Sequence, residues 1–550
     1  MQSAYFSFLN YLYMSIGNMV LFAASAWFLA GCSKSLEKEN TLPVAGTSRA
    51  SAAFAPRENP EGFALLSTTV IGGLGAAEIS AYDKKSRKLF VVNNTAGNNR
   101  IDVLDFSDPS HPLPLTSIPV SRYGGFVNSV AAYDGHLAAA IEAIPKTAAG
   151  KVVVFNTADY AEVKVITVGA LPDDVKYTPD GKLIVTANEG EPSPDYLTDP
   201  LGTISIISVK DNYAVVTLDF APFASSEISL KSRGLRKFGP GASFAQDMEP
   251  EFVTISSDSR TAWVTLQENN SIAKVDLRNK SITDIFPLGF KNYNLAGNSI
   301  DPSDRPLGTI AFNNWPVYGM YQPDGIAVLE LKTKEGENDN DEFAARDGNR
   351  IPYLFTANEG DARDYTAFTE EVRVGASTVV LNPTVFPAAA SLKLIQNLGR
   401  LNITNTLGKT GNGNEYNALY SFGARSFSVW NGNTGSLLYD SKNTLEQKVV
   451  QAGMYDDDRS DSKGVEPEGI VVGEVGKKML AFVGLERVDA VAIYDVTDPV
   501  QPRFLQILAT GDAPEGVLFI AAKDSPNGRS LLLVSSENDG VIKVYMPGLF

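Results

Sequence analysis

Acidic residues recur at two positions of a repeated sequence pattern, and carboxylates repeated in this way can hold a metal ion. The first position lies beside a proline near the start of each repeat, and its members are Asp173, Glu249, Asp324, Glu466 and Glu515. The second position follows an apolar stretch, and its members are Glu189, Glu268, Glu359, Glu486 and Glu537. Calcium takes roughly six to eight oxygen ligands. These carboxylates therefore predict a metal site with calcium as its cofactor.

Two inserted segments add candidate ligands with a less regular spacing. Asp361 and Asp364 follow Glu359 closely and flank Arg363, and a second acidic segment surrounds Arg459. Guanidinium groups bind phosphate and carboxylate oxygens through paired hydrogen bonds. The candidate ligand-binding residues are accordingly Arg363, Arg425, Arg459 and Arg487.

Two other interpretations of the repeated carboxylates stay open. A residue that recurs in each repeat can serve the fold, because its carboxylate can accept hydrogen bonds from backbone N–H groups of the neighbouring repeat. A pair of carboxylates can also act as acid and base in catalysis. The sequence alone leaves catalytic residues unassigned.

The repeat itself predicts the fold. Residues 171–190 and 249–269 share one pattern: an acidic residue near proline, an alternating strand, a turn, and a second apolar strand. The pattern returns from residues 322, 466 and 513, with weaker copies near Glu78 and Asn128. Strands of period two that repeat every 40 to 50 residues or so are typical of β-propeller blades. The seven copies predict an all-β, seven-bladed propeller with WD40-like or YVTN-like repeats.

Closure of the ring follows from the last repeat, which supplies only three strands and ends at 541–545. The unassigned apolar run 63–71 is expected to complete that blade, because closure removes exposed sheet edges. An eight-bladed ring is the alternative, and it would need 419–440 as a separate blade. We favour 426–430 and 436–440 as the third and fourth strands of the fifth blade.

Long insertions are expected on one face of this ring. The segments 220–247, 287–321, 360–419 and 441–465 all connect blades or join second strands to third strands, and these connections share a face. Only 333–350 is expected on the opposite face, as a solvated hairpin. Binding sites are commonly built from loops that a rigid scaffold positions.

The chain begins with an apolar segment that predicts export. Residues 1–31 contain no Lys, Arg, Asp or Glu, and Leu29, Ala30 and Gly31 precede Cys32, the only cysteine. This motif resembles a bacterial lipobox and predicts cleavage of a signal peptide before Cys32, which would then carry the lipid. An uncleaved membrane anchor is the alternative. The expected domains are the signal 1–31, a flexible tether 32–61 and the propeller 62–550.

Composition excludes several functions. The net charge of −17 disfavours nucleic acid as a partner, because nucleic acids are bound through basic contacts, and it favours cations. Two histidines, in turn-like sequence, argue against a Ser-His-Asp triad or a His-rich zinc site.

Several longer motifs together resemble the choice-of-anchor I family over roughly residues 62–547. The motifs are Glu249-Pro-Glu251, Asn314-Trp-Pro316, Met320-Tyr-Gln-Pro-Asp324, Thr356-Ala-Asn-Glu-Gly-Asp-Ala-Arg-Asp-Tyr365, Gly423-Ala-Arg-Ser-Phe427, Glu466-Pro-Glu-Gly469 and Gly484-Leu-Glu-Arg487. The resemblance implies a propeller-like domain carried by varied tethers. The family is similar to mesenchyme-specific cell-surface glycoproteins linked to biomineralisation, and bacterial relatives are often labelled alkaline phosphatase.

These observations predict a lipoprotein of the bacterial cell envelope, held at the membrane by lipid and facing the periplasm or the exterior. Its expected function is that of a calcium-dependent binding scaffold for a protein, glycan or small-molecule ligand. A metal-dependent phosphoester hydrolase that uses the same carboxylates is the alternative.

Overall fold

The computed structural model describes residues 57–332, 350–411 and 413–550, which belong to one compact unit spanning Ala55–Phe550. The predicted signal peptide, the lipid site at Cys32 and nearly all of the predicted hairpin 333–350 lie outside the described residues. In the part of the chain that is described, helices are too short or too polar to cross a membrane.

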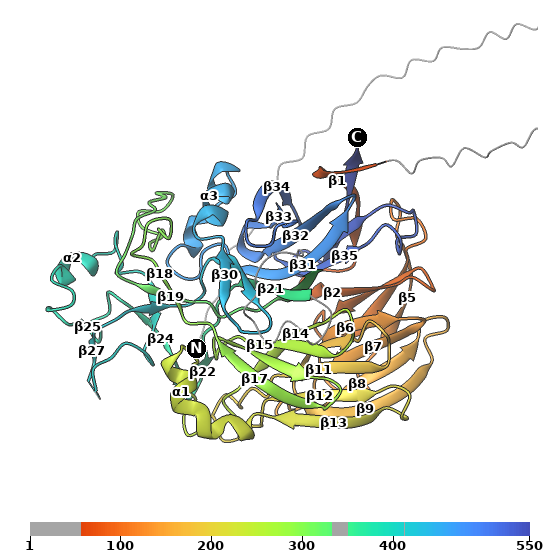
Figure 1. The fold of residues 1–550 in the computed structure, drawn as a ribbon, viewed down its shortest axis with the longest axis horizontal. Coiled ribbons are helices and arrows are strands. Elements are labelled where there is room, and N and C mark those ends of the chain that lie inside the picture. The colour runs from red at the N-terminus through yellow and green to blue at the C-terminus, as the bar shows by residue number, and fades with distance from the viewer. Residues whose placement is uncertain (1–56, 333–349, 412) are drawn as a thin grey trace, which may run out of the picture. The chain divides into compact units, whose positions relative to one another are not determined.

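Seven four-stranded antiparallel sheets form the main body of this unit (Figure 1). The first two sheets contain β2 (Ala76–Asp83), β3 (Lys88–Asn93), β4 (Arg100–Asp105) and β5 (Leu113–Pro119), then β6 (Val127–Tyr133), β7 (His136–Ile141), β8 (Ala149–Asn156) and β9 (Glu162–Ala170). The next two contain β10 (Pro172–Tyr177), β11 (Leu183–Asn188), β12 (Thr203–Ser208) and β13 (Ala214–Asp219), then β14 (Pro250–Ile255), β15 (Thr261–Leu266), β16 (Ser271–Asp276) and β17 (Ser281–Pro287).

The last three sheets complete the set. The fifth contains β20 (Ile326–Lys332), β21 (Arg350–Asn358), β29 (Ser426–Asn431) and β30 (Leu437–Asp440). The sixth contains β31 (Pro467–Val475), β32 (Lys478–Leu485), β33 (Ala490–Asp495) and β34 (Arg503–Ala509). The seventh contains β35 (Pro514–Ile520), β36 (Leu531–Ser536), β37 (Val541–Leu549) and β1 (Glu58–Val70).

The first strands of the seven sheets contact one another in a closed cycle. Strand β2 packs on β6, β6 on β10, β10 on β14, β14 on β20, β20 on β31, β31 on β35, and β35 again on β2. Each sheet is therefore one blade of a seven-bladed propeller, and its first strand is the innermost. The predicted fold class is confirmed, and β29 and β30 are the third and fourth strands of the fifth blade, as expected.

Strand β1 closes the ring by pairing antiparallel with β37 from Glu58 to Val70. Phe63 is buried and meets Phe482 of the sixth blade at a ring-centroid distance of 5.3 Å. The predicted closing strand 63–71 is thus confirmed. It begins at Glu58, so residues 58–61, expected in the tether, belong to the propeller.

Apolar sequence explains why the middle strands are buried. Strands β3, β7, β11 and β32 are nearly continuous apolar runs, because both faces of each blade pack against neighbouring blades. Outer strands such as β5 and β13 are mostly exposed. Trp263, Phe355 and Trp430 are among the largest buried side chains between blades. The blades therefore form a rigid scaffold for the loops.

The inserted elements leave the ring between blades or between second and third strands. They are η1 (Ala221–Ser226), α1 (Glu227–Ser232), β18 (Phe290–Asn292), β19 (Tyr318–Met320), β22 (Asp364–Tyr365), β23 (Phe368–Thr369), β24 (Glu371–Arg373), β25 (Val380–Leu381), α2 (Ala389–Leu392), β26 (Asn402–Thr404), β27 (Glu415–Tyr416), β28 (Tyr420–Ser421), α3 (Thr444–Gln451), η2 (Asp457–Arg459) and η3 (Glu486–Val488). Figure 1 shows α1, α2, β18, β19 and β24 together at the left of the view.

Two of these insertions form a second small core. Strand β28 pairs in parallel with β19, so that the segment before β20 and the segment before β29 share one sheet. Tyr293, Val317, Leu401 and Leu419 are buried together beneath them. The inserted loops are thus packed against each other, and they hold fixed positions next to the propeller.

Candidate functional site

One position is equivalent in all seven blades, at or just before the start of the innermost strand. It is occupied by Glu78, Asn128, Asp173, Glu251, Asp324, Glu468 and Glu515. In five blades a proline comes directly before it. We call these seven residues the inner ring.

Local backbone geometry aims the inner ring into the channel. The strand register shifts at this point in six blades, for example between Pro172 and Val175 and between Pro467 and Ile470. Leu171, Gln322 and Ala513, each two residues before an inner-ring residue, have positive φ angles of 48°, 41° and 54°. A bulge of this kind redirects a side chain. The repeated backbone irregularity therefore brings the side chains together.

A second equivalent position directly follows the second strand of each blade. It is occupied by Asn94, Glu142, Glu189, Gln267, Glu359, Glu486 and Glu537. Members of both positions line a cavity of about 410 Å³ at the mouth of the channel. Its acidic lining consists of Asp173, Asp174, Asp324, Glu359, Asp361, Glu468, Glu486, Glu515 and Glu537. The cationic side chains in the lining are Lys463 and Arg487, so negative charge is in excess.

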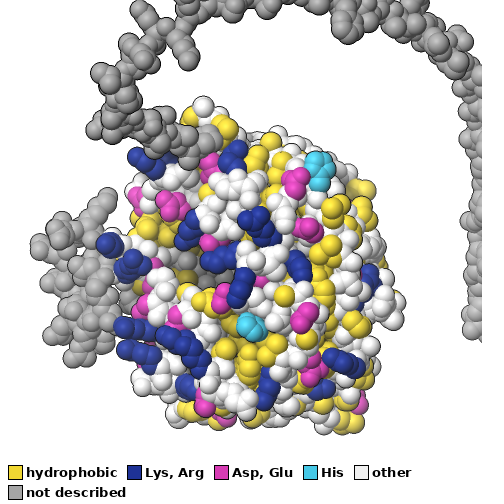
Figure 2. Space-filling model, turned by 90° about the vertical axis from the view of Figure 1, so that its right-hand side faces the viewer, with side chains coloured by type: hydrophobic (Ala, Val, Ile, Leu, Met, Phe, Trp, Pro, Cys, Tyr) yellow, Lys and Arg dark blue, Asp and Glu magenta, His cyan; other side chains and the backbone are white. Residues whose placement is uncertain are grey.

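The histidines take no part in this lining. His111 is exposed and bonds to Asp108 through Nδ1 at 3.1 Å. Figure 2 shows the two histidine side chains apart from each other on the surface. The chemistry of the cavity is therefore the chemistry of carboxylates with one lysine and one arginine.

The structure places three predicted ligands, in the fourth and sixth blades, outside the two equivalent positions. Glu251 and Glu468 occupy the inner ring, whereas the predicted ligands Glu249 and Glu466 form ion pairs. Gln267, not Glu268, occupies the second position, and its Nε2 donates to Glu359 Oε2 at 2.8 Å. Aligning the repeats on the proline, rather than on the first acidic residue, would have found Glu251 and Glu468.

Glu249 and Glu466 are paired with cationic side chains. Arg363 Nε donates to Glu249 Oε2 at 3.0 Å, and Arg363 Nη1 donates to Asp247 Oδ1 at 2.8 Å. Arg459 Nε donates to Glu466 Oε1 at 2.8 Å, and Lys463 Nζ lies 3.3 Å from Glu466 Oε2. Burial raises the pKa of Glu466, but these cations outweigh it and hold the pKa below its usual value.

The pKa of Glu249 is raised by burial to about 8 in spite of Arg363, and the inner-ring carboxylates also have raised pKa values. Burial, and then repulsion from Glu537, raises the pKa of Glu78 to about 8. Burial and Asp174 raise the pKa of Asp173 to about 7. Burial likewise raises the pKa of Glu515 to about 8. Carboxylates whose charge is this unfavourable gain most from a bound cation or a proton.

Three groups of carboxylates are close enough to share one ion, with their ligand atoms within 4.8 Å of one another. The groups are Glu189 with Glu251 and Glu268, Asp324 with Glu359 and Glu468, and Glu359 with Glu466 and Glu486. The sequence also left open that a carboxylate supports the fold by accepting hydrogen bonds from neighbouring blades. Asp174, next to the inner-ring residue Asp173, has this role. Its carboxylate accepts from Ser129 Oγ at 2.8 Å and from the Val253 backbone N–H at 3.0 Å, and so joins three blades.

Two of the predicted ligand-binding arginines are committed to internal contacts. Arg363 and Arg425 are 3% and 1% exposed. Arg425 Nη1 donates to the Asp301 backbone oxygen at 2.8 Å. Arg487 and Arg459 keep partly exposed side chains, and Arg487 lines the main cavity.

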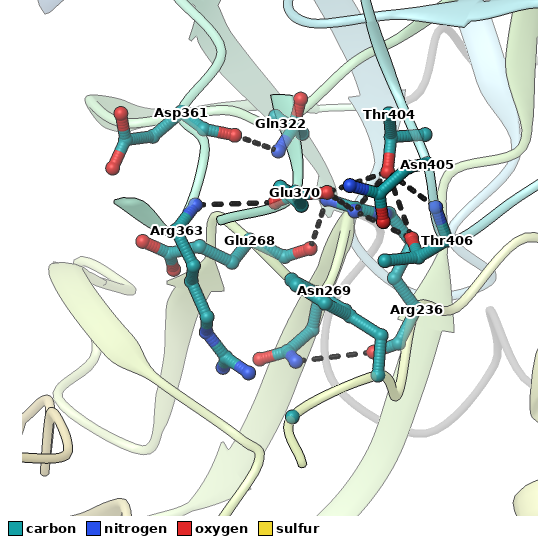
Figure 3. Close-up of polar contacts among 12 residues, drawn as sticks. Arg236, Glu268, Asn269, Gln322, Asp361, Arg363, Glu370, Thr404, Asn405 and Thr406 are labelled. Atoms are coloured by element: carbon teal, nitrogen blue, oxygen red, sulfur yellow. Dashed lines mark hydrogen bonds and ion pairs between the residues drawn. The ribbon is translucent and has the colours of Figure 1, made fainter. Parts of the chain in front are cut away.

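The remaining predicted ligands, Asp361 and Asp364, lie at the rim of the mouth, where a second cavity adjoins the first. Asp364 is exposed and, with Asp361, lines an adjoining cavity of about 460 Å³. Arg459 and Lys463 line it too. Figure 3 shows how this rim is fixed from below, where Arg236 bonds to Glu370 and Thr404 and the Arg363 backbone N–H donates to Glu370 at 3.2 Å.

Comparison with known proteins assigns the chain to a family. A family model of the choice-of-anchor I domain matches residues 78–499, so the chain belongs to the choice-of-anchor I family. It is 28% identical over 182 residues to Gigasin-3a of Magallana gigas, covering 27% of this chain and 64% of that protein. It is also 28% identical over 351 residues to the mesenchyme-specific cell surface glycoprotein of Strongylocentrotus purpuratus, covering 54% of this chain and 42% of that protein.

The chain thus spans less than two thirds of the length of either curated relative. Among solved structures, it is similar to Kuenenia stuttgartiensis hydrazine synthase, with a TM-score of 0.45 and 12% identity over 87% of this chain and 97% of that one. It is also similar to the WD40 domain of Toxoplasma gondii coronin, with a TM-score of 0.43 and 10% identity over 90% of this chain and 88% of that one.

Proposed function

We propose that this protein is a surface-anchored binding scaffold whose propeller mouth holds a divalent cation, calcium by preference. The observation that carries the proposal is the excess of buried carboxylates in one cavity, built from equivalent positions of successive blades. Such a cavity attracts cations, and flexible all-oxygen ligand sets suit calcium better than magnesium.

Anchoring is the second part of the proposal. Membership of the choice-of-anchor I family and the name of the Strongylocentrotus purpuratus relative, a cell surface glycoprotein, both support a place at the cell surface. The lipid on Cys32 is the proposed tether in a bacterial envelope. The packed insertions beside the mouth would supply the surface on which a protein, glycan or small-molecule partner docks.

Thermal unfolding of the purified propeller tests the cation. A ligand at one hundred times its dissociation constant stabilises the folded state by about 2.7 kcal/mol. Calcium should therefore raise the melting temperature, and chelation with EGTA should reverse the rise. The triple variant Asp173→Asn, Asp324→Asn and Glu515→Gln should respond less, whereas Asp211→Asn, an exposed turn residue of the third blade, should respond like the wild type. An unchanged melting temperature in calcium and in EGTA would remove the cation from this proposal.

Phosphoester hydrolysis is the second candidate, and Arg487 is the observation in its favour. Its guanidinium lines the cavity beside Glu486 at 2.9 Å and could hold a phosphate next to a bound metal. The measurement is release of p-nitrophenol from p-nitrophenyl phosphate with calcium, with zinc and with chelator. Metal-dependent turnover that is lost in Arg487→Gln would favour the hydrolase over the scaffold.

A further inference from the structure

We propose two unequal cation positions: a strong one formed by Glu189, Glu251 and Glu268, which are not part of the lining of the main cavity, and a weak one at the mouth in which Lys463 competes with the ion. This inference rests on the proposed cation function and specifies its ligands and its regulation.

The geometry of the first group fits a single ion. Its three ligand atoms lie within 4.8 Å of one another. Oxygens bound to one calcium ion at about 2.3–2.6 Å can be at most roughly 5 Å apart. Three carboxylates that each bind through one or two oxygens would supply roughly three to six of the six to eight oxygens that calcium takes.

Oxygens without partners point to the missing ion. Glu251 and Glu268 are 8% and 3% exposed, and in each of them Oε2 is buried and accepts no hydrogen bond. A buried carboxylate oxygen without a partner is strongly unfavourable. In Figure 3 only the backbone oxygen of Glu268 is engaged, by Arg236 Nη1 at 3.0 Å. The carboxylate itself is left for a ligand.

Protein cations near this group are engaged elsewhere. None of the ion pairs formed among the described residues includes Glu189, Glu251 or Glu268. The nearby Arg363 guanidinium is taken up by Asp247 and Glu249, and Lys146 is paired with Glu191. A divalent cation would therefore meet the full negative charge of three carboxylates.

The second group already holds a cation from the protein. Lys463 Nζ lies 2.6 Å from Oε1 of Glu359, a member of this group, and its side chain is only 15% exposed. It also lies 3.3 Å from Oε2 of Glu466, which belongs to the third group. Glu359 Oε2 accepts from Gln267. An ion that binds Asp324, Glu359 and Glu468 must displace the contacts of Glu359 with Lys463 and Gln267. This position therefore fills only at a higher calcium concentration than the first one.

Calcium titration by isothermal calorimetry tests the assignment. We expect the wild type to show one tight and one weak binding event. The variant Glu251→Gln/Glu268→Gln should weaken the tight event by at least about 100-fold, because even outer-shell changes cost about 10- to 100-fold in metal affinity. The matched variant Asp324→Asn/Glu468→Gln removes the same number of charges from the other group and should leave the tight event within about threefold of the wild type.

Lys463 is tested in the same titration. Lys463→Met should strengthen the weak event by at least about tenfold, because a unit positive charge no longer occupies the position. Circular dichroism checks that each variant is folded. If Lys463→Met does not fold, the two double carboxylate variants still test the assignment. Loss of the tight event in the matched variant, with full affinity in Glu251→Gln/Glu268→Gln, would overturn the assignment. Absence of any calcium binding by the wild type would instead overturn the proposed function itself.

Discussion

Glu249 and Glu251 are two residues apart, yet their replacement by glutamine should change stability in opposite directions. Glu249 is 1% exposed and pairs with Arg363. Glu249→Gln removes a charge from this buried pair, but Arg363 keeps its bonds to Asp247 at 2.8 Å and 2.9 Å. A hydrogen bond to a charged group contributes about 1.5–3 kcal/mol. Burial raises the pKa of Glu249 to about 8 in spite of Arg363, which offsets part of this contribution. We therefore expect a loss of at most about 2 kcal/mol.

Glu251→Gln removes a different kind of interaction. Burial, and then repulsion from Glu268 and Asp324, raises the pKa of Glu251 well above its usual value. In EGTA the buried carboxylate therefore destabilises the fold relative to the unfolded chain, so the neutral amide should stabilise it.

Differential scanning fluorimetry can separate these outcomes. Unfolding entropy is about 2.1 cal/mol/K per residue, so the roughly 480 described residues give about 1 kcal/mol/K. The melting temperature should fall by at most about 2 °C in Glu249→Gln and should rise in Glu251→Gln. With calcium present, Glu249→Gln should keep its response and Glu251→Gln should lose most of it. Equal destabilisation by both variants would show that both glutamates only support the blade, and would refute the cation argument.

Three further predictions concern pH, ring closure and anchoring. The pKa of Glu78, Asp173 and Glu515 is raised to between about 7 and 8, so above pH 4.5 the folded state binds more protons than the unfolded state. In EGTA the melting temperature should therefore fall from pH 5 to pH 8. Calcium should flatten this pH profile, and a melting temperature that rises with pH would contradict the assigned pKa shifts. Deleting 58–70 exposes the edge of β37 and should cause aggregation in light scattering, whereas deleting 33–56 should not; equal behaviour would argue against closure by β1. Cys32→Ser should move the protein out of the membrane fraction on fractionation and immunoblotting, and a variant that still carried lipid there would disprove the lipid site.

The sequence determined the architecture because the information is local and repeated. Period-two strands, turns at Asp180-Gly181 and Asp258-Ser259, and a fixed repeat length are enough to define a blade, and seven copies define the ring. The closing strand was predictable for the same reason, since the last repeat lacks a partner for one edge. Strand β1 indeed pairs with β37 along its length.

Only the tertiary structure decided which carboxylates meet. A shift of one or two residues turns a side chain from the channel to the space between blades, and bulges near Pro250 and Pro467 make this shift. Glu468 therefore lines the mouth and Glu251 meets Glu189 and Glu268, while Glu249 and Glu466 pair with Arg363 and Lys463. Arg363 lies more than a hundred residues from Glu249 in the sequence, whereas Lys463 lies three residues before Glu466, and both come from insertions. A repeat pattern contains no information about such insertions, because each occurs once, and the charge of the site depends on them.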